Sequence, residues 1–307
     1  MPIAEIDGLR VAYDLLGEEG DPWVITPGGR FSKDSPGVRG LAAALAETGK
    51  HVVVWDRPNT GASDVCFEGS SESAMQADTL AALLRELDLG PAVIAGGSGG
   101  SRVSLLTAAR HRDAARAIAV WWISGGPYGL LSLATHYCGN SIAAAWRDGM
   151  AAVADLPEWS EVLERNPDNR ARFLAQDRGE FIATLEQWML AYCPRPGELI
   201  PGVTDDDLRA LDLPALVWWG SLAPLRNTST GRSRPRASAS GRPGTSSSPH
   251  GQYATIQSSM AARNRRGSWL RNRSRFDGLR SSTSCHSSSA TTASIPPFHA
   301  ARIEPRQ

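Results

Sequence analysis

The sequence predicts an α/β fold over residues 1–222, with a doubly wound, mostly parallel sheet and a helical cap. Strand and helix signals alternate through the first 125 residues, and a glycine-rich turn at residues 96–100 joins a predicted strand to a predicted helix. The chain has 307 residues, 41% of them hydrophobic, which is enough for one large core or two modest domains. Strands that alternate with helices pair in parallel, because the helices cross over the faces of the sheet.

Short apolar runs mark the strands, and leucines that recur every three or four residues mark the helices. The sequence HVVVW at residues 51–55 is apolar through its middle, which is typical of a strand buried on both faces. The predicted strands are 9–16, 23–26, 51–55, 92–95, 117–123 and 215–219. The predicted helices of this part are 38–48, 73–87 and 101–111.

Residues 127–207 differ from the preceding residues in pattern: their apolar residues come at helical spacing, and β-branched runs are few. This pattern predicts a helical cap inserted between two parts of the core, residues 1–126 and 208–222. The cap carries Trp146, Trp159 and Trp188. For any one of these tryptophans, a place in the apolar core is the simpler interpretation, although each can also contact a substrate.

Residues 223–307 differ from the rest in composition. Residues 1–222 carry 18 basic and 30 acidic residues, whereas the last 85 carry 14 arginines, no lysine and two acidic residues. These 85 residues include 18 serines and only ten Leu, Ile, Val, Met, Phe or Trp, too few to offset the entropy of ordering the chain. We therefore predict an irregular or disordered segment, either a genuine arginine/serine-rich tail or the product of a frameshift in G+C-rich DNA.

The sequence disfavours a nucleic-acid-binding protein, a secreted protein and a membrane protein. The formal net charge is zero, which argues against nucleic-acid binding, and the N-terminus lacks the basic region and apolar run of a secretory signal. The longest uncharged stretch is broken by Gly125-Gly126-Pro127, which argues against a membrane span. The four cysteines show no metal-binding or disulfide spacing, so we expect a reducing, cytoplasmic setting with no metal and no cofactor. The arginine-rich tail leaves open a third class, non-specific binding to RNA or membranes, but we expect no specific nucleic-acid or membrane partner.

The chemistry is concentrated in Gly96-Gly97-Ser98-Gly99-Gly100, which matches G-x-S-x-G between a predicted strand and a predicted helix. This context is required for a nucleophile elbow, a sharp turn that presents a serine hydroxyl at the edge of the sheet. Ser98 is then the candidate nucleophile, and the amide of Gly99 a candidate oxyanion donor. The two other glycine-rich motifs are excluded. A dinucleotide-binding fingerprint would need a glycine at position 102, where this chain has Arg102, and a phosphate-binding loop would need a lysine nearby, where this chain has none.

Two further segments follow predicted strands. Thr26-Pro27-Gly28-Gly29-Arg30 is a glycine-rich loop in which the amide of Gly29 or Arg30 can serve as the second oxyanion donor. The segment DRPNTGASD at residues 56–64 follows the strand 51–55. Its turn residues favour a structural role for Asp56 and Arg57 over a catalytic one.

Together, these three segments resemble the α/β-hydrolase superfamily over residues 1–222. The resemblance implies an eight-stranded, mostly parallel sheet, Ser98 as the nucleophile, and the amides of Gly29 and Gly99 as the oxyanion hole. It also implies a catalytic acid just after the strand 215–219 and a histidine after one final strand. No Asp or Glu stands between Gly220 and Asp277, so the acid and the histidine of this chain are unknown.

None of the six histidines stands where the family order requires it. His51, His111 and His136 come too early, and His250, His286 and His299 follow no predicted strand. Without an aligned histidine, the Ser98 hydroxyl keeps the high pKa of an alcohol. We therefore expect weak activity and marginal stability, with the strand 215–219 left as an exposed sheet edge.

The leading prediction for function is hydrolysis of a small ester, lactone or similar carbonyl substrate through an acyl-enzyme at Ser98. We expect a small-molecule substrate between the sheet edge and the cap, and the oligomeric state is unknown. Carbon–carbon bond hydrolysis and non-catalytic ligand binding stay open as alternatives. The candidate substrate contacts are Arg30, Trp122, His136 and Trp146.

Overall fold

The computed structural model describes residues 1–124, 127–220 and 298–303. An eight-stranded sheet lies at the centre of the molecule, with neighbouring strands in the order β1-β2-β4-β3-β5-β6-β9-β10. The pairs from β4 through β9 are parallel, and β1, β2 and β10 pair antiparallel at the two edges. The strands are β1 (Ile3–Ile6), β2 (Leu9–Leu16), β3 (Asp21–Thr26), β4 (Lys50–Trp55), β5 (Ala92–Gly97), β6 (Ala115–Trp121), β9 (Ala215–Gly220) and β10 (Phe298–Ile303). The predicted doubly wound, mostly parallel sheet is confirmed.

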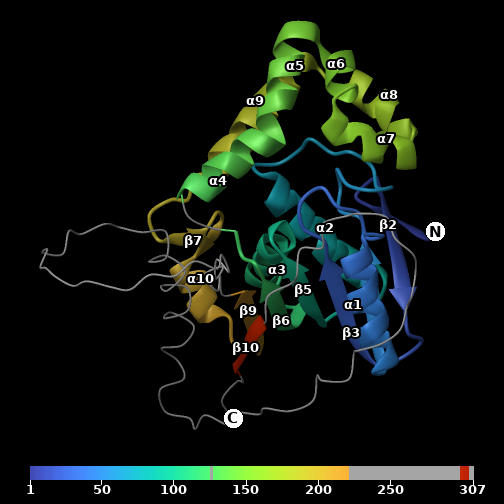
Figure 1. Cartoon of the computed structure of the whole chain (residues 1–307), viewed down its shortest axis with the longest axis vertical. Helices are drawn as coiled ribbons and strands as arrows, with labels where there is room; N and C mark the ends of the chain where they lie inside the picture. Colours follow the sequence, from blue (N-terminus) through green and yellow to red (C-terminus); the bar gives the residue numbers. More distant parts are fainter. Residues whose placement is uncertain (125–126, 221–297, 304–307) are drawn as a thin grey trace, which may run out of the picture.

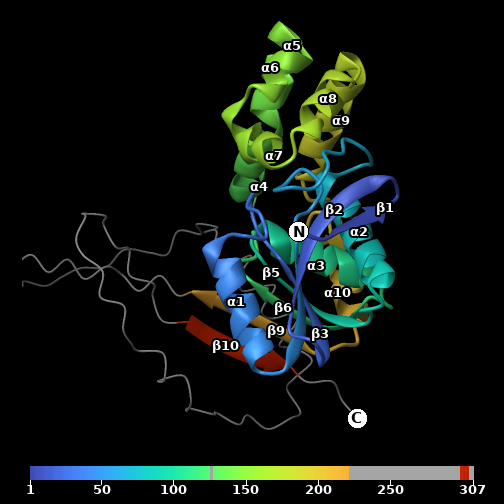
Figure 2. The ribbon, with the colours of Figure 1, turned by 90° about the vertical axis from the view of Figure 1, so that its right-hand side faces the viewer.

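Helices cover both faces of this sheet. Helix α1 (Pro36–Glu47) lies on one face, and α2 (Glu72–Glu86) and α3 (Gly99–Arg110) lie on the other (Figure 2). The middle strands are apolar on both sides, so alternate residues enter two separate clusters. Val24 and Val53 pack with the leucines of α2, whereas Ile25 and Val52 pack toward α1.

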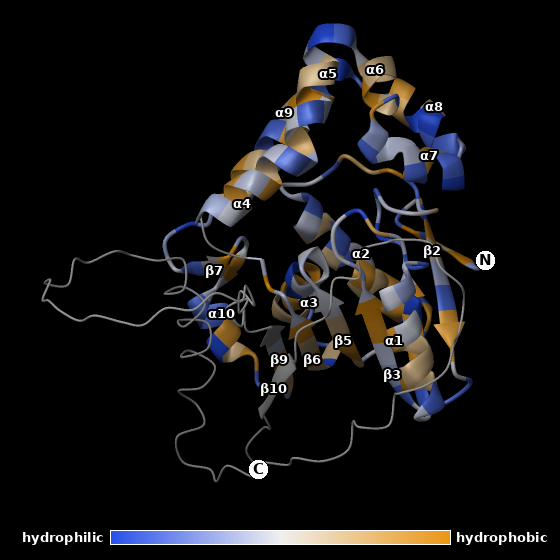
Figure 3. Cartoon of the chain, viewed as in Figure 1, coloured by the Kyte–Doolittle hydropathy of each residue, from blue (hydrophilic) through white to orange (hydrophobic). Residues whose placement is uncertain are grey.

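A group of short helices rises above the carboxyl ends of the parallel strands (Figure 1). These helices are α4 (Pro127–Ala134), the π-helical turn η1 (Thr135–Gly139), α5 (Asn140–Asp148), α6 (Met150–Ala154), the 3-10 turn η2 (Pro157–Trp159), α7 (Ser160–Arg165), α8 (Asp168–Leu174) and α9 (Arg178–Ala191). Their own apolar cluster includes Trp159 and Trp188, both fully buried as expected of core tryptophans, and Phe67 from the loop before α2. Helices α7 and α8 consist mostly of hydrophilic residues, whereas β3 in the sheet is mostly hydrophobic (Figure 3).

The chain returns from the cap to the sheet through a hairpin and a short helix. The hairpin is β7 (Glu198–Ile200) with β8 (Val203–Thr204), and α10 (Asp205–Ala210) follows it. Thr204 caps α10, since its hydroxyl accepts a hydrogen bond from the amide of Asp207 while the Asp207 carboxylate accepts one from the Thr204 amide. Ile200 and Val203 belong to the apolar cluster beneath α2 and α3, so this segment packs with the core layer.

The prediction that β9 forms an exposed sheet edge is wrong. Strand β10 pairs antiparallel with all six residues of β9, from Phe298 opposite Gly220 to Ile303 opposite Ala215. The prediction failed because ladder pairing needs only backbone N–H and C=O groups, and the run 298–303 contains no Ser, Gly or Pro to interrupt it. The rest of the predicted arginine/serine-rich tail, with His250, His286 and the frameshift hypothesis, lies outside the described residues.

A buried carboxylate ties the core to the cap. Asp64 is fully buried and accepts hydrogen bonds from the Arg10 amide at 2.9 Å and from Asn166 Nδ2 at 2.9 Å. It also forms ion pairs with Arg10 and with Arg172 of α8, at 3.1 and 2.6 Å. Burial by itself would raise the pKa of Asp64, but these hydrogen bonds and the charge of Arg172 hold that pKa below its usual value.

We expect Asp64→Asn to lower the free energy of unfolding by about 3 kcal/mol at pH 7, because it breaks a buried charge network. The ionised carboxylate contributes its full stability above the pKa of the unfolded chain, about 3.9. That contribution is lost as the pH falls through the lower folded-state pKa. Urea unfolding between pH 7 and pH 2.5 should therefore show the gap between wild type and variant closing below about pH 4.

Asp155→Asn is the matched control, because Asp155 pairs with Arg170 on the cap surface, where both side chains are about half exposed or more. An exposed pair of this kind contributes less than about 1 kcal/mol. Equal losses in the two variants at pH 7 would contradict the assignment of Asp64 as the link between core and cap.

Candidate active site

Ser98 lies at the turn between β5 and α3, where the sequence predicted a nucleophile elbow. Its backbone has φ 53° and ψ −118°, a conformation that non-glycine residues rarely adopt and that stores strain. The amide of Ser98 donates to the carbonyl of Trp121 at 3.0 Å, and its carbonyl accepts from the Ser101 amide at 3.1 Å in the first turn of α3. The strained turn is therefore held on both sides, by β6 and by α3.

The glycines around Ser98 are required by close backbone packing. A Cβ atom on Gly100 would overlap the carbonyl oxygen of Thr26, and one on Gly96 would overlap that of Gly100. A Cβ atom on Gly28 would lie 2.6 Å from the carbonyl oxygen of Gly97 and 3.1 Å from the Ser98 Cβ. These contacts bring the loop after β3 directly against the elbow.

The two amides predicted to form an oxyanion hole lie beside each other. A Cβ atom built on Gly99 would lie 3.5 Å from the backbone nitrogen of Gly29. The Gly99 amide is in the first turn of α3, where N–H groups have no partner within the helix. The Gly29 amide donates no hydrogen bond to the described part of the chain. Neither amide therefore has a hydrogen-bond partner in the described part of the chain.

Arg57 holds the Gly29 loop in place. Its Nη2 donates to the carbonyl of Gly29 at 2.6 Å and to that of Gly28 at 3.4 Å, and its Nη1 donates to Gln76 Oε1 at 3.3 Å. The structural role expected for Arg57 is therefore to fix the loop that carries Gly28 and Gly29. Asp56 is also structural, since its carboxylate accepts from the amides of Lys33 at 2.6 Å and Ala62 at 2.9 Å.

The Ser98 hydroxyl contacts another serine. Ser98 Oγ lies 3.2 Å from Ser124 Oγ, and none of the histidines whose side chains the structure describes, His51, His111 and His136, hydrogen-bonds to it. His111 pairs with Asp78 at 2.6 Å at the far end of α3, and His51 is in β4. Sequence reasoning missed Ser124, although it lies three residues after the end of β6, the strand beside β5.

The predicted substrate contacts do not all gather at one place. Arg30 lines a small cavity together with Gly29 and Gly99, and it forms an ion pair with Glu72 at 2.6 Å. Trp122 follows β6 with 59% of its surface exposed. His136 is exposed and packs edge-on against Tyr137, a residue that lines the same cavity. Trp146 is 61% exposed on α5 and lines neither this cavity nor the larger one described below, so its role stays a prediction.

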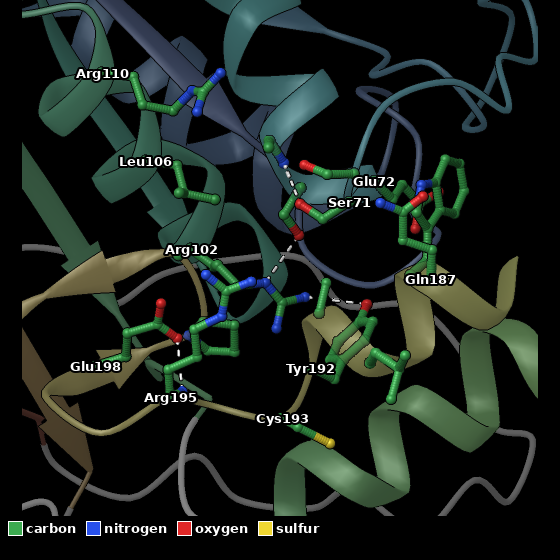
Figure 4. Close-up of a pocket in the computed structure, with 18 residues that line it drawn as sticks. Ser71, Glu72, Arg102, Leu106, Arg110, Gln187, Tyr192, Cys193, Arg195 and Glu198 are labelled. Atoms are coloured by element: carbon green, nitrogen blue, oxygen red, sulfur yellow. Dashed lines mark hydrogen bonds between the residues drawn. The ribbon is translucent and has the colours of Figure 1, made fainter. Parts of the chain in front are cut away.

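Two adjoining cavities lie on the α2–α3 side of Ser98. The inner cavity, which Gly29 and Gly99 border, has a volume of about 10 Å³. The outer cavity has a volume of about 360 Å³ and lies between the start of α2, α3 and the end of α9 (Figure 4). Arg102, Tyr192, Glu72 and Ser73 line both, so these side chains form the wall between the two.

The described residues contain no cluster of side chains suited to a metal ion. Cys66 and Cys138 are buried free thiols, and burial raises their pKa to about 11 and about 12, which makes them unreactive. None of the helices within the described ranges combines the length and the apolar content that a membrane span requires.

The fold is identified by the eight-stranded, mostly parallel sheet together with the strained serine in the turn directly after β5. The chain has the α/β-hydrolase fold. A scan against protein-family models matched none, and a search of curated proteins found no significant match.

Solved structures with a similar arrangement include Est816, described as an N-acyl homoserine lactone degrading enzyme, with 22% identity and a TM-score of 0.43. Others are an enol-lactonase from Burkholderia xenovorans LB400, at 22% and 0.46, and a thermophilic esterase from Thermogutta terrifontis, at 21% and 0.47. The three comparisons cover 70–71% of this chain and 79–80% of the other chains. These are likenesses of architecture alone.

Proposed function

We propose that this α/β-hydrolase-fold chain hydrolyses a small ester, lactone or similar carbonyl compound, with Ser98 as the nucleophile. The observation that carries the proposal is the strained backbone of Ser98 beside two available amides, those of Gly29 and Gly99. Strain of this size persists only where the surrounding structure enforces it, and it gathers at functional sites.

In the proposed reaction, Ser98 Oγ forms a bond to the carbonyl carbon while the hydroxyl proton passes to solvent water, which later returns a proton to the leaving alcohol. The negative charge on the carbonyl oxygen is stabilised by the Gly29 and Gly99 amides. Collapse of this intermediate breaks the bond to the leaving alcohol, which takes up a proton, and leaves an acyl group on Ser98. Water then attacks the acyl carbon, releases the acid and restores the hydroxyl.

Among the side chains that the structure describes, the partner of the Ser98 hydroxyl is Ser124, and none of them is a base in contact with it. An alcohol is a poor acceptor at neutral pH, so Ser98 is only weakly activated. Loss of the base and the acid from a serine triad costs about 10⁴–10⁶ in kcat. We therefore expect slow turnover, with activated esters reacting first.

Hydrolysis of 4-nitrophenyl butyrate tests this proposal. We expect a burst of one equivalent of nitrophenol per chain, followed by turnover well below the about 1–10³ s⁻¹ of ordinary enzymes. Ser98→Ala should abolish the burst, because no acyl-enzyme can form. Ser160→Ala, at an exposed serine of α7, is the control and should retain it. An identical time course in wild type and Ser98→Ala would overturn the proposed nucleophile.

The Ser98–Ser124 contact also favours a second function, binding of a ligand without turnover. In that case a carbonyl compound would bind wild type and Ser98→Ala equally, and neither protein would convert it. Turnover at an ordinary enzymatic rate that disappears in Ser98→Ala would instead contradict the expected weak activity and would place a base in residues outside the described ranges.

A further inference from the structure

The inner cavity next to the oxyanion amides carries an excess of positive charge. Three guanidinium groups line it, those of Arg30, Arg57 and Arg102, against the single carboxylate of Glu72. Glu72 is already engaged, because it accepts from Arg30 Nη1 at 2.6 Å and from Asn59 Nδ2 at 3.0 Å. Within the described residues, the cavity wall therefore has one acid for three arginines.

Arg57 and Arg102 are buried with neutral partners. Their residues are 4% and 5% exposed. Arg57 donates to backbone carbonyls and to Gln76, as described above. Arg102 donates through Nε to Ser73 Oγ at 2.9 Å and through Nη2 to the Tyr192 hydroxyl at 3.3 Å, and it lies over the Tyr192 ring at 4.6 Å (Figure 4).

Each of these two guanidinium groups also keeps a buried N–H without an acceptor in the described part of the chain. The atoms are Arg57 Nε and Arg102 Nη1. Burying a charged donor without an acceptor is costly, and buried charges are ordinarily paired. Burial holds the pKa of Arg57 below its usual range; the charge of Glu72 opposes this shift, and the like charges of Arg30 and Arg102 add to it. An anion in the cavity would supply both the missing acceptor and the missing charge.

We propose that the substrate carries a carboxylate on its acyl side, which Arg57 and Arg102 bind in the inner cavity. This inference rests on the proposed function, because it takes the Gly29 and Gly99 amides as the site of the scissile carbonyl. Those amides border the same cavity, so the carboxylate and the carbonyl belong to one short acyl chain. The unpartnered nitrogens, Arg57 Nε and Arg102 Nη1, would each donate a charge-assisted hydrogen bond to the carboxylate.

A bound carboxylate needs more room than the inner cavity offers with its present walls. The volume of this cavity, about 10 Å³, is close to what a single water molecule needs. More space lies directly behind Arg102, in the outer cavity of about 360 Å³, whose wall Arg102 and Tyr192 form (Figure 4). The proposal therefore includes a displacement of the Arg102 and Tyr192 side chains toward the outer cavity when the carboxylate binds.

Equilibrium binding to the full-length Ser98→Ala protein tests the inference without any turnover. The probes are monomethyl glutarate, which has an ester at one end and a carboxylate at the other, and methyl 4-carbamoylbutanoate, its neutral amide. Isothermal titration calorimetry should show at least about tenfold tighter binding of the carboxylate, since charge-assisted hydrogen bonds are about twice as strong as neutral ones.

Variants in the same background assign the preference to Arg102. Adding Arg102→Gln should remove the preference for the carboxylate, and Arg102→Lys, which keeps the charge, should retain part of it. Arg85→Gln is the matched control, because Arg85 is exposed on α2 and lines neither cavity. Circular dichroism of each variant checks that it is folded, and the Lys variant keeps the test informative if the Gln variant unfolds.

Equal affinity for the two probes would overturn the inference, as would a preference that Arg102→Gln leaves unchanged. Inorganic phosphate distinguishes a substrate pocket from a general anion site: tighter binding of phosphate than of monomethyl glutarate would also overturn it. Because Ser98 is absent from every protein in this test, its outcome is independent of whether Ser98 is the nucleophile.

Discussion

Gly100→Ala should destabilise the protein by about 4 kcal/mol or more, among the largest effects expected of a single substitution. The added Cβ would overlap the carbonyl oxygen of Thr26 and would lie 2.7 Å from that of Pro27. Both neighbours are backbone atoms at the end of β3, so no side chain can turn away to make room. Relief requires α3 to move off the sheet, which would also displace Ser98.

Gly40→Ala is the matched control, because Gly40 is an exposed interior residue of α1 and a Cβ there would meet nothing within 4 Å. Alanine favours a helix over glycine by about 1 kcal/mol, so this variant should be slightly stabilised. Urea unfolding followed by circular dichroism measures both. Similar unfolding midpoints for the two variants would contradict the close packing of the elbow against β3.

Arg57→Lys should slow the burst of nitrophenol about 10²-fold, close to the effect of losing one oxyanion donor. Lysine keeps the charge, but it cannot donate to the Gly29 carbonyl, the Gly28 carbonyl and Gln76 at once, as the guanidinium does. The Gly29 amide would then lose its fixed position beside Gly99. Arg57 is thus a positioning residue, and its substitution should lower kcat far more than it raises KM.

Single-turnover kinetics with 4-nitrophenyl butyrate separate these two effects. The neutral acyl chain of this ester keeps the proposed carboxylate contact out of the measurement. Arg85→Lys, at an exposed position of α2, is the control and should match wild type. A variant with unchanged kcat and raised KM would show that Arg57 acts on substrate affinity and would contradict its role in holding the Gly29 loop.

The parts of the fold that sequence reasoning predicted are those with strong local signals. Strand β4 is a buried parallel strand, so its apolar run is continuous, and α2 repeats leucines at helical spacing. The missed strands β1, β7 and β8 have two to four residues each, too few to establish a period. Strand β10 was missed because its pairing depends on the backbone and on a partner about 80 residues earlier in the chain.

The candidate site also has a part that local sequence signals predicted and a part that they could not. The elbow could be predicted because the close approach of strand and helix imposes glycine at adjacent positions. The arginine-lined cavity could not, since Arg30, Arg57 and Arg102 come from three segments that only the folded sheet brings together. From the sequence, Arg102 was used only to exclude a dinucleotide fingerprint. An arginine in the first turn of the helix after the elbow could also have indicated a positive charge beside the candidate site.

Covalent labelling shows whether Ser98 is an activated nucleophile. The full-length protein is incubated with an alkyl fluorophosphonate, which phosphorylates an activated serine and loses fluoride, and the adduct is located by peptide mass spectrometry. We expect one adduct per chain on the peptide that contains Ser98, formed slowly and absent from Ser98→Ala. Labelling no greater in wild type than in Ser98→Ala, or an adduct confined to another residue, would contradict this expectation.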